Sequence, residues 1–246
     1  MNRKASTFIP ERIGIGLSAV LFGVPALLLW LATDLGVPCL VARGWDPLLA
    51  WFLAGAVVFV PLLVAAVVGA SMTLSTSSPS AILKHLRVRR LSLAEWRLTA
   101  LTLAATAAAI AGLTLLNMKA WPGLSTEPSF MTVRTLVPAQ YYLLAFWLPF
   151  FAVNIIGEEL WWRGFIQPRQ EPVFGRSTWI VQGLLHAAFH VSFGPGVVFI
   201  LWPALFGIPW LVQRSQNTSA GMVVHAGING VGFLTINLGL VPIQAT

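Results

Sequence analysis

Long apolar stretches, separated by short polar segments, run along most of the chain. A helix needs about 20 predominantly apolar residues to cross the hydrocarbon core of a bilayer. Stretches near this length predict spans at residues 13–33, 47–71, 98–117, 139–167, 177–193, 196–213 and 218–238. The alternating pattern of barrel strands is absent, and helices or closed barrels are the only ways to satisfy the backbone in lipid. The expected fold class is therefore all-α, a polytopic bundle of about seven transmembrane helices (six to eight).

Local patterns add detail to this bundle. Gly194, Pro195 and Gly196 separate the fifth and sixth spans, which predicts a tight hairpin there. The run of small side chains from 104 to 112 predicts close approach of a neighbouring helix to the third span. Ser92 and Glu95 have the spacing of a capping box, which predicts the start of the third helix.

Composition places the chain far from an ordinary soluble domain. Hydrophobic residues make up 57% of the sequence and charged residues 9%, and the mean hydropathy is +0.80. No repeat is evident, and the polar stretch 71–97 is too short to fold alone, so residues 1–246 are expected to form one integral membrane domain. We expect the segment 13–33 to be a retained first helix, because it is long enough to span and lacks a convincing cleavage site. The single Cys39 excludes an internal disulfide framework.

The distribution of basic residues predicts the orientation in the membrane. With a cytoplasmic N-terminus, only Arg43, Lys119 and Arg134 lie on the outer side. Cytoplasmic segments carry the excess of Lys and Arg in membrane proteins, so the N-terminus is expected inside a cell inner (plasma) membrane that the chain crosses several times. The net charge of +7 and the cluster KHLRVRR (84–90) are interpreted as contacts with anionic membrane lipids, not with nucleic acid. The residues expected on the inner side are Arg3, Lys4, Arg12, Lys84, Arg87, Arg89, Arg90, Arg97, Arg163, Arg169, Arg176 and Arg214.

Two adjacent carboxylates, Glu158 and Glu159, lie inside an apolar span, in the sequence GEELWWRG. A charged side chain at membrane depth costs about 2.5–3.5 kcal/mol on insertion scales, so such a residue usually faces a cavity or a partner and marks a functional site. The structural alternative is an ion pair with Arg163, whose long side chain could extend to the inner surface and neutralise one glutamate. Neighbouring residues point about 100° apart on a helix, so the two glutamates are expected to have different roles.

Other polar residues are predicted at the same depth. His186 and His190 are four residues apart on the fifth span, and His225 and Asn229 are four apart on the seventh. Counted from the cytoplasmic ends, these side chains lie about 10–20 Å deep, in the same layer as Glu158. A carboxylate beside imidazoles can act as a general base towards water. A second imidazole with an amide could stabilise the oxyanion of a tetrahedral intermediate.

These residues resemble the three motifs of the CPBP family, which includes CAAX prenyl endopeptidases and bacteriocin-processing or self-immunity proteins. The resemblance covers residues 139–238, the expected catalytic core, through Glu158-Glu159-x-x-x-Arg163, His190 and His225-x-x-x-Asn229. It implies an intramembrane endopeptidase that opens towards the cytoplasm and hydrolyses a membrane-associated or lipidated peptide. The resemblance assigns Glu158 and His190 to activation of water, His225 and Asn229 to the oxyanion hole, and Glu159 and Arg163 to supporting positions.

One position departs from the family pattern, and the cofactor is left open. The second motif usually has a phenylalanine four residues before its histidine, where this chain has His186. That imidazole could be a metal ligand, a supporting partner or a tolerated substitution, and we favour the supporting partner. The family is labelled a metalloprotease, and Glu158, His190 and His225 would suit a catalytic Zn²⁺ site of three ligands and one water. The same residues also suffice for a metal-free glutamate mechanism.

Two other classes of function remain open from the sequence. A proton-coupled transporter could use a relay of Glu and His, although paired half-repeats and interrupted helices are not evident. A non-catalytic immunity or scaffold protein could keep the same fold without turnover. The abundant tryptophans, including Trp161 and Trp162, are interpreted as interface and packing residues rather than a grip on a prenyl chain.

Overall fold

The computed structural model describes residues 11–240, and within them the fold is entirely helical, as predicted. Arg3 and Lys4, used above for the orientation, lie outside the described residues. The main helices are α1 (Ile15–Leu31), α3 (Pro47–Leu74), α5 (Leu93–Ala120), α6 (Leu143–Glu158), α8 (Thr178–Phe189), α9 (Pro195–Ser215) and α10 (Thr218–Asn237). Shorter elements are α2 (Val37–Val41), α4 (Pro79–His85), α7 (Gln167–Phe174), the π-helices η1 (Ala32–Gly36) and η3 (Glu159–Ile166), and the 3₁₀ turns η2 (Pro138–Gln140), η4 (Gly175–Ser177) and η5 (Val191–Phe193).

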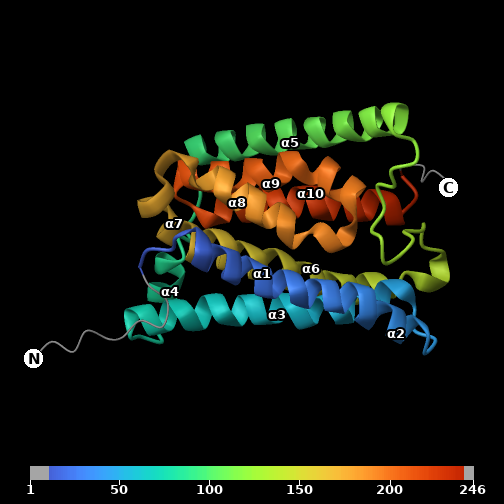
Figure 1. Ribbon diagram of the computed structural model, residues 1–246, viewed down its shortest axis with the longest axis horizontal. Helices are drawn as coiled ribbons and strands as arrows, with labels where there is room; N and C mark the ends of the chain where they lie inside the picture. The colour runs from blue at the N-terminus through green and yellow to red at the C-terminus, as the bar shows by residue number, and fades with distance from the viewer. Residues whose placement is uncertain (1–10, 241–246) are drawn as a thin grey trace, which may run out of the picture.

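Six continuous helical stretches are long and apolar enough to cross a membrane among the residues described. The fourth, Leu143–Phe189, has 47 residues and contains both the fourth and the fifth predicted span. A straight helix of that length would measure about 70 Å, more than twice the hydrocarbon core. The chain instead turns at Gly175, whose φ of +55° is in the region that favours glycine. Figure 1 shows α8 running back beside α9 and α10 after this turn.

The helices are stacked in layers that enclose the polar motifs. In Figure 1, α5 and α3 form the two outer faces, while α6, α8, α9 and α10 lie between them and α1 lies near α3. Contacts join α3 to α6, α8 to α9, and α10 to both α5 and α9. The predicted site residues lie on α6, η3, α10 and the C-terminal end of α8, which are in the middle of the bundle between α3 and α5.

Glycine allows the motif helix to pack closely against α3. A Cβ at Gly157 would lie 2.6 Å from the backbone oxygen of Phe59, a distance that no side chain could accept. An aromatic contact joins η3 to α1: Trp162 stacks on Phe22 with 4.0 Å between ring centroids, and Trp162 is completely buried. The burial of Trp162, and of Trp161 beside it, agrees with a packing role for these two residues.

The local predictions have mixed outcomes. Ser92 and Glu95 form the predicted capping box at the start of α5, and α9 begins directly after Gly194, whose φ is +95°. The close approach of a helix predicted for the small residues 104–112 is seen at one position of the run, while most of its other side chains are exposed. That position is Thr106, which packs against Gly207 on α9, since a Cβ at Gly207 would lie 3.2 Å from the Thr106 hydroxyl oxygen.

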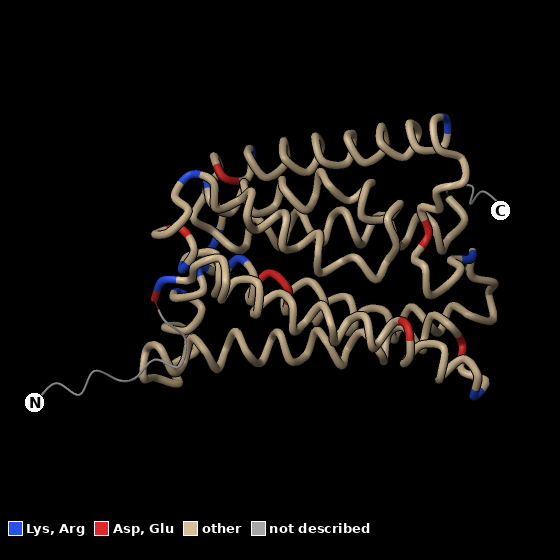
Figure 2. The backbone as a smooth tube through the Cα atoms, viewed as in Figure 1, with Lys and Arg blue, Asp and Glu red and all other residues tan. Residues whose placement is uncertain are grey.

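The two ends of the bundle differ in charge. Figure 2 shows Lys and Arg gathered at the end where α4 and α7 lie, and fewer basic residues at the opposite end. Two ion pairs organise this basic end: Arg87 with Glu171 at 2.8 Å, and Arg89 with Glu95. The asymmetry is the one from which a cytoplasmic N-terminus was predicted, and that orientation stays a prediction.

Candidate active site

Glu158 and Glu159 are buried at the junction where α6 becomes the π-helix η3. Their residues are 1% and 0% exposed, and their side chains contact different helices. Glu158 is 2.8 Å from His186 on α8, whereas Glu159 is 2.9 Å from His225 on α10. Adjacent residues diverge by about 100° around a helix. The two carboxylates therefore have different partners, which agrees with the expectation that they have different roles.

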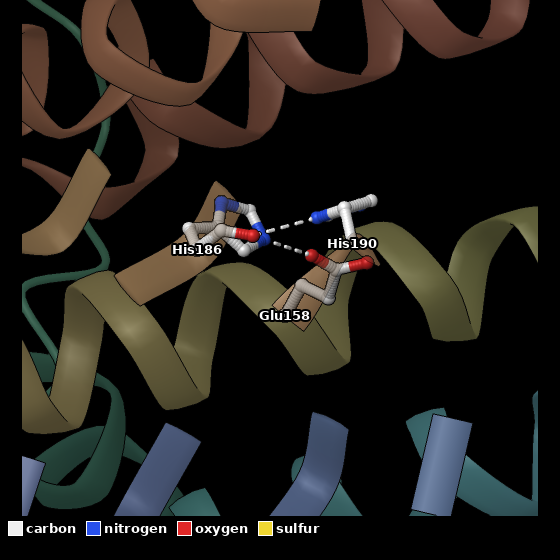
Figure 3. A group of neighbouring side chains, drawn as sticks. All are labelled: Glu158, His186 and His190. Carbon is white, nitrogen blue, oxygen red and sulfur yellow. Dashed lines mark hydrogen bonds and ion pairs between the residues drawn. The ribbon is translucent and has the colours of Figure 1, made fainter. Parts of the chain in front are cut away.

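Two donors orient the Glu158 carboxylate. Asn154, one turn earlier on α6, donates from Nδ2 to Oε1 at 2.8 Å. His186 lies on the other side, with Nε2 at 2.8 Å from Oε2, as Figure 3 shows. Each carboxylate oxygen can accept two hydrogen bonds, so each keeps one acceptor position for a further donor. The carboxylate is thus fixed in orientation and still able to accept a proton.

His190 lies at the end of α8, next to Glu158 and His186. Its Nδ1 is 3.0 Å from the backbone oxygen of His186 and donates to it, because a carbonyl oxygen only accepts. In the neutral ring this leaves the lone pair of Nε2 without a partner among residues 11–240. His190 is partly exposed, whereas Glu158 and His186 are buried. The accessible group beside the carboxylate is therefore a ring nitrogen that can accept.

Glu159, His225 and Asn229 form a second chain of contacts. His225 donates from Nδ1 to Glu159 Oε1 at 2.9 Å, because the carboxylate only accepts. Asn229 Nδ2 lies 3.1 Å from His225 Nε2. His225 is 6% exposed and Asn229 is partly exposed, so the amide lies at the outer end of this chain.

Arg163 joins the two chains of contacts. Its Nη2 is 2.8 Å from His186 Nδ1, and its Nη1 is 3.4 Å from Glu159 Oε1. The guanidinium is completely buried. The idea that this side chain could extend to the inner membrane surface is therefore wrong, while the ion pair with one glutamate is present. A buried cation beside the buried Glu159 carboxylate reduces the cost of placing that charge in the membrane interior.

The arrangement at His186 does not fit a metal site. Among the described residues, a group with possible ligand atoms within 4.8 Å of one another is formed by Glu158, His186 and His190, without the His225 of the ligand set expected from the sequence. A metal-bound histidine donates its other ring N–H to a carboxylate, carbonyl or water. At His186 the nitrogen that faces Arg163 is Nδ1. Because arginine is only a donor, Nδ1 must accept and Nε2 must carry the proton. That Nε2 has no lone pair to offer an ion.

Asn154 and Gly221 are two neighbours of the glutamates that the motifs did not indicate. Asn154 is a polar residue four positions before Glu158 in an apolar helix, and this spacing alone could have suggested the contact. Gly221 lies on α10, where a Cβ would be 2.6 Å from Glu159 Oε2. Nothing local in the sequence distinguishes Gly221 from the other glycines of α10, because its role depends on how two distant helices cross.

Comparison with known proteins gives one match. Residues 140–231 match the family model described as type II CAAX prenyl endopeptidase Rce1-like. Neither the comparison with curated proteins nor that with solved structures gives a match. The matched segment contains every site residue described above and nearly coincides with the core expected at 139–238. Residues 140–231 are thus similar to the Rce1-like type II CAAX prenyl endopeptidases, in agreement with the family that the motifs indicated.

Proposed function

We propose that the chain is an intramembrane endopeptidase that hydrolyses a peptide bond near the cytoplasmic leaflet by means of a glutamate-activated water. The observation that carries the proposal is the buried Glu158 carboxylate, oriented by Asn154 and His186 beside the partly exposed His190. Orienting donors keep a general base in one place and leave its free lone pairs in a defined direction. The family match supports the same class of reaction.

Glu158 and His190 would hold the water between them. Both present acceptors, because Glu158 keeps a lone pair on each oxygen and the neutral His190 ring keeps one on Nε2. A water that donates one proton to each acceptor turns its own lone pairs towards an incoming carbonyl carbon. Glu158 would then take the proton that the attacking water loses and return it to the leaving amine.

His225 and Asn229 would stabilise the negative oxygen of the intermediate. Asn229 Nδ2, at 3.1 Å from His225 Nε2, would move from that nitrogen to the substrate oxygen. His225 Nε2 donates only when the ring carries a second proton, and the Glu159 carboxylate at Nδ1 would stabilise the resulting imidazolium. Donors aimed at a developing oxyanion usually make the largest contribution to such catalysis.

The proposed substrates are membrane-associated or lipidated peptides presented at the end of the bundle that carries α4 and α7. Lys and Arg gather at that end, and in membrane proteins such an excess is cytoplasmic. We place the protein in a cell inner membrane on the same grounds. The basic residues there would contact anionic lipid headgroups while a peptide enters between the helices.

The test is cleavage by the native chain and by Glu158→Gln, reconstituted in liposomes. The probes are a fluorogenic peptide with a farnesylated CAAX-type C-terminus and the same peptide without the lipid. Glutamine keeps the size and the acceptor oxygen but cannot accept the proton, so turnover should fall by about 10²–10⁴-fold, the usual contribution of a general base. Thermal unfolding in detergent should show that the variant is folded.

Glu127→Gln is the matched control, because it makes the same chemical change in the loop between α5 and α6, outside the site. It should cleave as the native chain does. Since other peptides could be the substrate, membrane proteomes of cells with the native chain and with Glu158→Gln should be compared for uncut polypeptides. Equal cleavage, or identical proteomes with no cleavage of either probe, would contradict the proposal.

A further inference from the structure

We propose that His186 is a positioning residue, fixed by Arg163 as the neutral ring with its proton on Nε2, which holds the Glu158 carboxylate for catalysis. The role in catalysis rests on the proposed function, whereas the protonation of the ring follows from the contacts alone. His186 is the position at which this chain departs from the phenylalanine of the related motif.

Hydrogen-bond chemistry determines which nitrogen carries the proton. Arg163 has no lone pair to offer, so at 2.8 Å its Nη2 must donate to His186 Nδ1. Once Nδ1 accepts, a ring with one proton must carry it on Nε2, and Nε2 lies 2.8 Å from Glu158 Oε2. A ring turned by 180° would put carbon atoms at both contacts. The geometry allows one neutral tautomer and excludes the imidazolium, which would place N–H groups of two cations against each other.

The packing around the ring prevents other arrangements. His186 is 3% exposed and has Phe189 stacked at 5.8 Å and Trp162 at 6.0 Å between ring centroids. His190 approaches edge-on at 4.6 Å. The ionisable groups around the ring are Glu158, Arg163 and His190, and two of these occupy its nitrogens. His186 therefore has no free lone pair with which to act as a base.

Arg163 acts on Glu158 through this ring. The guanidinium contacts the Glu159 carboxylate directly. It is connected to Glu158 only through the imidazole, which contacts both residues. A donor at Nδ1 draws electron density from the ring and makes Nε2–H a stronger donor, as happens along chains of hydrogen bonds. His186 thereby passes part of the effect of the arginine to the carboxylate and fixes the position of Oε2.

The first experiment reads the protonation of the ring directly and does not depend on proteolysis. The chain has four histidines, so ¹⁵N-histidine labelling in detergent gives few ring signals, and His186→Gln identifies the relevant pair. We expect one protonated nitrogen assigned as Nε2 and one unprotonated nitrogen assigned as Nδ1, unchanged by addition of Zn²⁺. A proton on Nδ1, an imidazolium, or a shift of the Nε2 signal with Zn²⁺ would overturn the assignment.

The second experiment compares two substitutions that differ in hydrogen bonding. Glutamine can accept from Arg163 with its oxygen and donate to Glu158 with its nitrogen, whereas phenylalanine fills the space and does neither. On the fluorogenic peptide, His186→Phe should lower kcat by about 10–100-fold with KM changed less than threefold, and His186→Gln should recover at least half of this loss on a logarithmic scale. Loss of packing alone would not favour glutamine over phenylalanine.

His85 supplies the matched control. It also lies against an arginine, with Nε2 at 3.2 Å from Arg169 Nη2, but it is on α4 outside the site. His85→Phe should leave kcat within about twofold of the native value. Equal activity of His186→Phe and the native chain, or equal loss in both His186 variants, would overturn the positioning role. Failure of the proposed function would be seen separately, as cleavage that does not depend on Glu158.

Discussion

Gly221 on α10 lies directly against the carboxylate of Glu159, because a Cβ at this position would be 2.6 Å from Glu159 Oε2. The same Cβ would be 2.8 Å from Val212 Cγ2 on α9, so neither neighbour leaves room for a side chain. Helix α10 can therefore bring His225 to within 2.9 Å of Glu159 only because residue 221 has no side chain. The absence of a side chain at residue 221 thus permits the polar contact between α10 and η3.

Gly221→Ala should consequently destabilise the protein and lower peptide cleavage. The added methyl group overpacks the crossing, which typically costs about 1–3 kcal/mol, and it pushes the Glu159 carboxylate away from His225. Gly232→Ala on the same helix is the control, since a Cβ there meets nothing within 4 Å. Alanine at that position should leave stability unchanged or raise it by about 0.5–1 kcal/mol. Thermal unfolding in detergent measures the stability of both variants. Equal unfolding temperatures would contradict the prediction that Gly221 lies in a close contact.

The sequence predicted the architecture because lipid imposes strong rules on spanning segments. Apolar length alone located the helices, and the six spanning stretches, with the fourth reversing at Gly175, correspond to the seven predicted crossings. The fourth predicted span, 139–167, ended too early, since helix continues through α7 to Phe174. The predicted span ends directly before Pro168, but a proline near the start of a helix lacks only an N–H that has no partner there.

The partners of the site residues were harder to predict than their depth. Spacing placed Glu158, His186 and His190 in one layer, but it could not say that His186, more than His190, would make the direct contact with Glu158. Nor could it place Arg163 completely inside the bundle, between His186 and Glu159. These contacts depend on the rotation of each helix about its axis. That rotation is determined by packing against helices that are far away in the sequence. The π-helical geometry of η3 changes the rotation further and has no clear local cause in the sequence.

Arg163→Met should be among the most destabilising single changes in the chain. It removes the cation next to the buried Glu159 carboxylate, and breaking a buried ion pair from one side costs about 3–5 kcal/mol. Adding Glu159→Gln should recover much of this loss, because a neutral amide needs no counter-ion and its oxygen can still accept from His225. The unfolding temperatures should follow the order native, double variant, Arg163→Met. If the losses of stability caused by Arg163→Met and by Glu159→Gln alone simply added in the double variant, the two residues would not be coupled through charge.

His85 should make stability depend on pH at the basic end of the bundle. Burial lowers the pKa of His85 below its ordinary value, and the positive charges of Arg169 and Arg87 lower it further. The unfolded chain therefore binds a proton at His85 more readily than the folded chain, so protonation favours unfolding. The contribution to stability is complete above the ordinary histidine pKa and is lost as the pH falls through and below it. Since glutamine can accept from Arg169 without titrating, the unfolding temperature of His85→Gln should fall less than that of the native chain between pH 7.5 and pH 5.5. An equal fall in both proteins would contradict this prediction, because it would show that folding does not change how readily His85 binds a proton.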